Sequence, residues 1–203
     1  GNLGTMLSGK IAFKQKLNIS DKADKLFKGA LIYQNPPYKL APIISKAKLA
    51  NACTDISDGL ASSIYSLCNA SGVGAVIDES KVPIHEESIN ISRILNIRPM
   101  QLTLTGGDWQ YLYSIPKKHI DEVQQIANDV GYPISIIGKI IEENKVVLKT
   151  LENEYKALLR VENDRFSKHT GESFFKRLEK EITFFDDSIS SELKNKLESI
   201  TNE

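Results

Sequence analysis

Two carboxylates and a hydroxyl lie close together in the stretch Thr54-Asp55-Ile56-Ser57-Asp58-Gly59-Leu60. The pattern predicts the end of a strand followed by the first turn of a helix, a place where open α/β sheets bind their ligands. Backbone N–H groups at a helix N-terminus suit phosphate oxygens. Carboxylates beside them suit Mg²⁺, a hard cation that takes oxygen ligands. A site for phosphate and magnesium is therefore one interpretation of this turn.

A structural role explains the same residues equally well. Asp55 or Ser57 is a good helix N-cap, and acidic residues in a first helical turn stabilise the helix without any ligand. The spacing of the residues does not decide between the two interpretations.

A second phosphate-binding candidate stands near the start of the chain, where Gly4-Thr-Met-Leu-Ser-Gly9-Lys10-Ile11 is one residue short of a P-loop. A P-loop needs a buried strand before it and a Ser or Thr after its lysine, and this stretch has neither. Residues 5–17 are therefore predicted as a helix instead.

The hydrophobic pattern around these stretches predicts a mixed α/β body. Helices are expected at about 21–33, 38–47, 60–71, 84–97 and 117–130, and strands at 50–56, 74–78, 110–115, 135–141 and 145–149, the last two joined by the turn Glu142-Glu143-Asn144. Residues 50–78 make a candidate βαβ-like unit.

The end of the chain carries two apolar stripes at helical spacing, which predict two tail helices that pack on the body, in preference to binding a partner. The first stripe is Phe174, Phe175, Leu178, Ile182 and Phe185, and the second is Ile189, Leu193, Leu197 and Ile200.

Composition excludes several classes of partner and location. The 203 residues include 26 basic and 26 acidic side chains, so no bulk positive charge indicates nucleic acid or an anionic membrane. No apolar run reaches the roughly twenty residues of a membrane helix, and the N-terminus lacks the pattern of a signal peptide. We therefore expect a cytoplasmic protein. The chain opens without an initiator methionine, so we also expect a piece of a longer protein.

Cysteine and histidine give no sign of a metal centre. Cys53 and Cys68 form no CxxC pair, and we expect two buried free thiols. The histidines His85, His119 and His169 are too far apart in the sequence to argue for a catalytic role.

The segment Asp55-Ile-Ser-Asp-Gly-Leu60, followed by Ser71-Gly-Val-Gly-Ala75 and Val82-Pro83, closely resembles the C-terminal domain of the thiamine-monophosphate kinase family. That family belongs to an ATP-binding superfamily that also contains aminoimidazole ribonucleotide synthetase, selenophosphate synthetase and a hydrogenase-maturation protein. The resemblance covers roughly residues 1–166 and leaves 167–203 as a helical extension. It includes the stretches Gly1–Gly4, Asn35–Tyr38, Leu104–Asp108 and Ile137–Ile140.

The resemblance implies a fold with a mixed sheet flanked by helices, followed here by the helical tail. It implies an ATP- and Mg²⁺-dependent kinase that phosphorylates thiamine phosphate to thiamine diphosphate. Asp55 and Asp58 match the family's Mg²⁺ ligands, and Ser57 matches a serine that contacts ATP. An N-terminal domain absent from this chain would supply most of the other metal carboxylates and pair with its counterpart in a homodimer. We therefore expect this chain alone to fold but to be inactive.

The chain departs from the family pattern at two substrate-binding positions. The family's Gly-Gly-Glu-Asp-Tyr-Glu becomes Gly106-Gly-Asp-Trp-Gln-Tyr111, which makes Asp108 the acid expected near thiamine, with a turn residue before a strand as the alternative. The family's terminal His-Phe is echoed by Phe166, a second expected substrate contact. These departures keep two other functions open: a related ATP-dependent synthetase with another substrate, and a non-catalytic domain that binds a metabolite or a partner.

Overall fold

The computed structural model describes residues 1–161, 178, 180 and 184–201. The helices are α1 (Thr5–Lys14), α2 (Asp21–Ile32), α3 (Leu40–Lys46), α4 (Leu60–Ser71), α5 (Glu86–Leu95), α6 (Ile120–Asp129) and α8 (Ser191–Thr201). The strands are β1 (Ala52–Ile56), β2 (Gly74–Asp78), β3 (Gln110–Ser114), β4 (Gly138–Ile141), β5 (Val146–Lys149), β6 (Tyr155–Leu158) and β7 (Phe185–Asp186). Short 3₁₀ turns occupy Glu79–Lys81, Pro99–Leu102 and Lys117–His119.

A five-stranded sheet in the order β4-β2-β5-β6-β7 forms one half of the fold. Strands β2 and β5 run parallel, and the other neighbours are antiparallel. Alternate residues of β2 point to opposite faces, so Ala75 and Ile77 pack in the main core beside α4, whereas Val76 packs in a second cluster with Leu193 and Leu197 of α8. The sheet therefore lies between α4 and α8.

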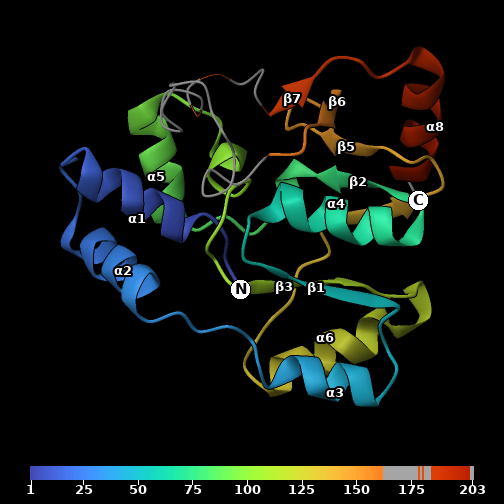
Figure 1. The fold of residues 1–203 in the computed structure, drawn as a ribbon, viewed down its shortest axis with the longest axis horizontal. Helices are drawn as coiled ribbons and strands as arrows, with labels where there is room; N and C mark the ends of the chain where they lie inside the picture. The colour runs from blue at the N-terminus through green and yellow to red at the C-terminus, as the bar shows by residue number, and fades with distance from the viewer. Residues whose placement is uncertain (162–177, 179, 181–183, 202–203) are drawn as a thin grey trace.

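A separate ribbon of two antiparallel strands, β1 and β3, forms the other half. Helices α3 and α6 lie on one side of this ribbon and α4 on the other (Figure 1). The prediction of a βαβ-like unit at residues 50–78 was wrong as regards pairing, because β1 pairs with β3 and β2 lies in the larger sheet. The ribbon carries the acidic turn at the end of β1.

The N-terminal helices α1 and α2 pack with α5 beside the ribbon and the sheet (Figure 1). A side chain at Gly9 of α1 would place its Cβ 2.9 Å from the Cβ of Phe27, so glycine lets α1 and α2 approach closely here. Helix α1 begins at Thr5 with no strand directly before it. The structure thus agrees with the sequence prediction that this stretch is a helix and not a P-loop.

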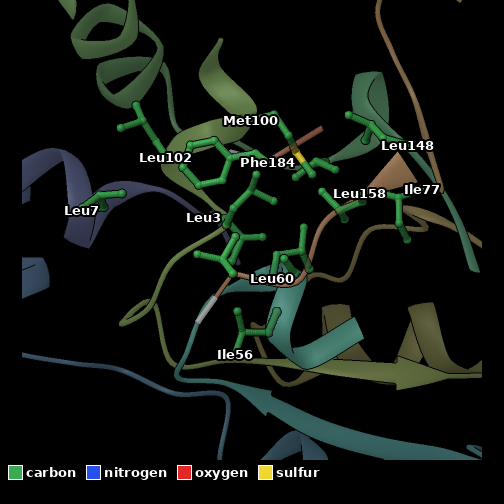
Figure 2. Packing of buried hydrophobic residues seen from close by; sticks show 14 of the residues in the cluster. Leu3, Leu7, Ile56, Leu60, Ile77, Met100, Leu102, Leu148, Leu158 and Phe184 are labelled. Carbon is green, nitrogen blue, oxygen red and sulfur yellow. The ribbon is translucent and has the colours of Figure 1, made fainter. Parts of the chain in front are cut away.

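The main hydrophobic core joins these parts. Figure 2 shows Leu3 and Leu7 near the N-terminus, Ile56 at the end of β1 and Leu60 at the start of α4 within one cluster of buried side chains. Burying a residue on each side of the acidic turn fixes the backbone of that turn while its polar side chains face outward.

A buried ion pair ties the end of β2 to the following turns. Glu79 Oε2 lies 2.8 Å from an Arg98 nitrogen and accepts a hydrogen bond from the Leu151 N–H at 3.2 Å. Burial raises the pKa of Glu79 above its usual range, and the charge of Arg98 opposes that rise.

Three features of the second half differ from the sequence expectations. Strand β6 had no predicted counterpart, and β2 lies between β4 and β5, so the turn at Glu142-Glu143-Asn144 closes no hairpin. Phe185 lies in β7 and is not helical. Most of the first predicted tail helix lies outside the described residues. The second is confirmed as α8, packed on the sheet.

The two cysteines have different surroundings. Cys68 is a buried free thiol, as expected, and burial raises its pKa. Cys53 is exposed, so the prediction that it would be buried was wrong, because its β1 position places its side chain on the less covered face of the ribbon. Every helix in the described parts of the chain is too short or too polar to cross a lipid bilayer.

Candidate functional site

The acidic turn joins β1 to α4 in three residues, Ser57 to Gly59. Its backbone is held by Ser63 of α4, whose hydroxyl donates to the carbonyl oxygens of Asp55 at 2.8 Å and Gly59 at 2.9 Å. Asp55 and Asp58 are exposed, and Ser57 is partly buried. The structure thus places Ser57 and Asp58 on the turn itself and Asp55 two residues before it, near the end of β1.

The N-terminus of α4 has no side-chain cap. Gly59 is its N-cap residue, with φ +92°, and among the described residues no side-chain cap bond is formed at this N-cap. The alternative interpretation of Asp55 or Ser57 as a helix cap was therefore wrong. The partial positive charge of this helix end lies beside the acidic turn.

Two glycines hold the acidic turn against the loop Leu104–Gly107. A Cβ on Gly59 would lie 2.4 Å from the carbonyl oxygen of Leu104, and a Cβ on Gly106 would lie 2.3 Å from the carbonyl oxygen of Ser57. The Trp109 N–H donates to the Ile56 carbonyl at 3.1 Å. The two loops are in backbone contact, so neither moves independently of the other.

Asp108, the next residue of this loop, caps helix α1. Its carboxylate accepts hydrogen bonds from the N–H of Gly4 at 2.7 Å, the N–H of Met6 at 3.2 Å and the hydroxyl of Thr5 at 3.2 Å. Burial raises the pKa of Asp108, and these hydrogen bonds act in the opposite direction. A ligand would compete with three existing bonds for this carboxylate.

The donor set of the turn fits part of a magnesium site. Two aspartates and a hydroxyl are hard oxygen donors, and Mg²⁺ is usually bound through one or two carboxylates together with substrate phosphates and water. Within the described ranges no group of three or more His, Cys, Asp or Glu gathers as a metal cage. The turn therefore fits a shared site, completed by phosphate and water, and not a self-sufficient one.

A largely apolar groove of about 820 Å³ runs between the ribbon, α4 and β4. Ile56, Gln110 and Tyr111 line it, and Lys81, Lys117 and Lys139 are its charged lining residues. Asp55, Ser57 and Asp58 do not line it. This groove is thus distinct from the acidic turn, although Ile56 at the end of β1 borders both.

Comparison with known families identifies the domain. The family model for AIR synthase related protein, C-terminal domain, matches residues 3–150. The chain belongs to this family.

Curated relatives of this AIR synthase related domain include thiamine-monophosphate kinases. One from Buchnera aphidicola is 30% identical over 142 residues, which cover 69% of this chain and 43% of the relative. Another from Pyrococcus horikoshii is 29% identical over 117 residues, covering 57% of this chain and 34% of the relative. The chain thus spans less than half the length of these relatives.

Solved structures support the same fold. The thiamine-monophosphate kinase of Stenotrophomonas maltophilia superposes with a TM-score of 0.65 at 20% identity, over 73% of this chain and 48% of that one. A structure described as AaThiL complexed with AMPPCP and TMP superposes with a TM-score of 0.60 at 25% identity, over 76% and 48%. The expected fold, a mixed sheet flanked by helices with a C-terminal helix, is confirmed.

The site residues of this AIR synthase related domain stand as follows. Ser57 and Asp58 lie on the turn, Asp55 lies near the end of β1, and Asp108 follows the loop that contacts the turn. Phe166 lies outside the described residues. Sequence reasoning missed the pairing of Gly59 with Leu104 and of Gly106 with Ser57, although the consecutive glycines 106 and 107 before a strand were a sign of close backbone approach.

Proposed function

We propose that this chain is the C-terminal part of an ATP- and Mg²⁺-dependent kinase that phosphorylates thiamine phosphate to thiamine diphosphate. The observation that carries the proposal is the uncapped, acidic turn at the start of α4, in a family whose relatives include thiamine-monophosphate kinases. A relative with the same fold has been crystallised with AMPPCP and TMP, which supports ATP and thiamine phosphate as the two substrates.

The residues of the turn take the following roles in this proposal. Asp55 and Asp58 hold Mg²⁺, and the Ser57 hydroxyl donates to a phosphate oxygen of ATP. The Leu60 N–H donates to the Thr103 carbonyl oxygen at 2.9 Å, so in this proposal the positive end of the α4 dipole, and not the first N–H, favours the negative charge of the phosphates. When bound, Mg²⁺ neutralises charge on the phosphates. Phosphoryl transfer asks the protein mainly for positioning and charge stabilisation, so no histidine base is required.

Other parts of the protein complete the site in this proposal. An N-terminal domain supplies further carboxylates and much of the nucleotide pocket, and the native protein is a cytoplasmic homodimer that binds neither nucleic acid nor membranes. Asp108 and Phe166 contact thiamine phosphate. Asp108 then acts from its position at the N-terminus of α1, with its side chain keeping some of its bonds to Gly4 and Met6.

A second candidate is a related ATP-dependent synthetase that acts on another substrate. The sequence Asp108-Trp-Gln-Tyr111, which lacks the family's further acids after Asp108, favours it. A non-catalytic domain that binds a metabolite or a partner is a third candidate, supported by the same departure.

The test is an assay of the native protein with ATP, Mg²⁺ and thiamine phosphate, in which thiamine diphosphate is separated and quantified. We expect product only when both ATP and Mg²⁺ are present. Mg²⁺-dependent binding of AMPPCP without product would favour the related synthetase, and no binding of AMPPCP would favour the non-catalytic domain. We expect the 203-residue chain alone to give no product, because its turn supplies only part of the ligand set.

A further inference from the structure

Trp109 has an unusual backbone conformation for its residue type. Its φ is +52°, in the left-handed region that bulky side chains rarely adopt. Among the described residues, four other non-glycine residues have positive φ. Lys16, Lys48 and Asn96 follow helix ends, and Asn153 lies in the turn between β5 and β6. Left-handed residues are common in such places. Trp109 instead directly precedes strand β3, so no helix end explains its conformation.

Contacts on both sides of Trp109 impose this conformation. Its N–H donates to Ile56 at the end of β1, and the side chain of Gln110 donates to the carbonyl oxygen of Asp108 at 3.1 Å. The carboxylate of Asp108 is itself held by the start of α1. Strained residues persist where the surroundings determine them in this way, and such residues cluster at ligand sites.

The indole is not used to fill the core. Trp109 is 40% exposed, and it belongs to none of the buried clusters of the described residues. Through its hydrogen bond to Ile56 it stands beside the residue that separates Asp55 from Ser57. The backbone therefore places a partly exposed aromatic residue next to the acidic turn.

We propose that Trp109 is a stacking platform for the cationic ring of the phosphate acceptor, and thus a specificity-determining residue of this site. The inference rests on the proposed function, whose acceptor, thiamine phosphate, carries a positively charged thiazolium ring. Tryptophan is the aromatic side chain that attracts cations best. The adenine of ATP is neutral and lacks this cation–π attraction, so the indole favours the cationic ring.

The kinetic test compares Trp109→Asn, which tolerates the left-handed backbone, with Trp109→Phe, which keeps a ring. In the native protein we expect Trp109→Asn to raise KM for thiamine phosphate roughly tenfold, the size of a desolvated cation–π contact. We expect kcat and KM for ATP to stay within about twofold, and Trp109→Phe to keep most of the affinity. Tyr33→Ala, which removes a ring that is 79% exposed on the connection from α2 to α3, is the matched control and should change neither KM.

Stability separates this role from a structural one. If Trp109 serves the ligand, Trp109→Asn relieves strain and leaves Tm within about 2 °C of the wild type. A large loss of Tm together with an unchanged KM for thiamine phosphate would overturn the platform. A rise in KM for ATP without a rise for thiamine phosphate would overturn it as well.

Fluorescence gives a readout that does not depend on turnover. Trp109 is the single tryptophan of the 203 residues, and the difference between wild type and Trp109→Phe isolates its emission in the native protein. We expect thiamine phosphate to quench this emission and AMPPCP to leave it unchanged. If the wild type makes no thiamine diphosphate, the proposed function fails. Quenching by thiamine phosphate would still support the platform, and unquenched emission would overturn it.

Discussion

Helices α1 and α4 both begin next to aspartates, yet the two helix starts use them differently. At α1 the carboxylate of Asp108, from a loop about a hundred residues away in sequence, bonds to Gly4 and Met6. At α4 the N-cap residue is Gly59, which makes no side-chain cap bond within the described part of the chain, and Asp55 and Asp58 are exposed. An acid beside a helix dipole thus stabilises the fold at α1, whereas at α4 the acids are exposed and form the site that we propose for Mg²⁺ and phosphate.

The largest effect should come from the aspartates at α4. If the proposed function holds, we expect Asp55→Asn and Asp58→Asn each to lower kcat/KM of the native protein roughly 100- to 1,000-fold, the loss typical of a group that stabilises transferring phosphate charge. Their free energies of unfolding should change by less than about 0.5 kcal/mol, because both side chains are exposed.

The control for this prediction is Asp121→Asn, which neutralises an exposed acid in the first turn of α6. It should leave turnover unchanged. Full activity in both variants of the turn would show that these carboxylates do not hold the metal.

The second-largest effect is expected at the contact between the acidic turn and the loop Leu104–Gly107. Gly106→Ala places a Cβ against the Ser57 carbonyl, and we expect it to cost about 2–3 kcal/mol of unfolding free energy in chemical denaturation. Gly29→Ala in α2 is the matched control, since nothing lies within 4 Å of its Cβ, and it should stabilise by about 0.5–1 kcal/mol. Similar results for both variants would mean that the loops are not in contact.

A smaller effect is expected at α1. Asp108→Ala removes the acceptor of three hydrogen bonds, and we expect a loss of about 2 kcal/mol of unfolding free energy, with Asp108→Asn losing less. The loss should persist in the absence of any substrate. If Asp108→Ala were as stable as the wild type but had a raised KM for thiamine phosphate, Asp108 would be a ligand contact and not a cap of α1.

The smallest effect concerns pH. Burial raises the pKa of Asp108 above its ordinary value of 3.8, so the folded protein holds this proton more tightly than the unfolded chain. Its contribution is fully present below pH 3.8 and is lost as pH rises through the folded pKa, with a slope of at most about 1.4 kcal/mol per pH unit. The difference in unfolding free energy between wild type and Asp108→Asn should therefore decrease over that range. An increase would show that the hydrogen bonds outweigh burial.

The sequence predicted local elements better than their pairing. The helix from Leu60 and the strand at Gly74–Asp78 follow from apolar periodicity and a closing Ser71-Gly72. That β1 pairs with β3, 54 or more residues away, depends on packing between distant segments, which periodicity does not encode. Phe185 shows the same limit, because its apolar stripe suited a helix while edge pairing with β6 made it a strand.

The site was predictable in its residue types but not in its division of roles. Asp55, Ser57 and Asp58 are adjacent in sequence, so their shared turn needed only a strand-to-helix junction. The capping of α1 by Asp108 joins residues more than a hundred positions apart, and no local pattern contains it. Nothing in the sequence indicated the positive φ of Trp109, because that conformation is set by the contacts of its neighbours.

Helix α8 has a consequence for biosynthesis. Val76, Val147 and Tyr155 form one face of the sheet, which is buried against Leu193 and Leu197 of α8. These two leucines are translated well after strands β2 and β5, which carry Val76 and Val147. Until α8 emerges from the ribosome, the nascent chain presents this apolar face to the cell, where it is a target for chaperones and a risk for aggregation. Completion of this face of the sheet is therefore coupled to the synthesis of α8.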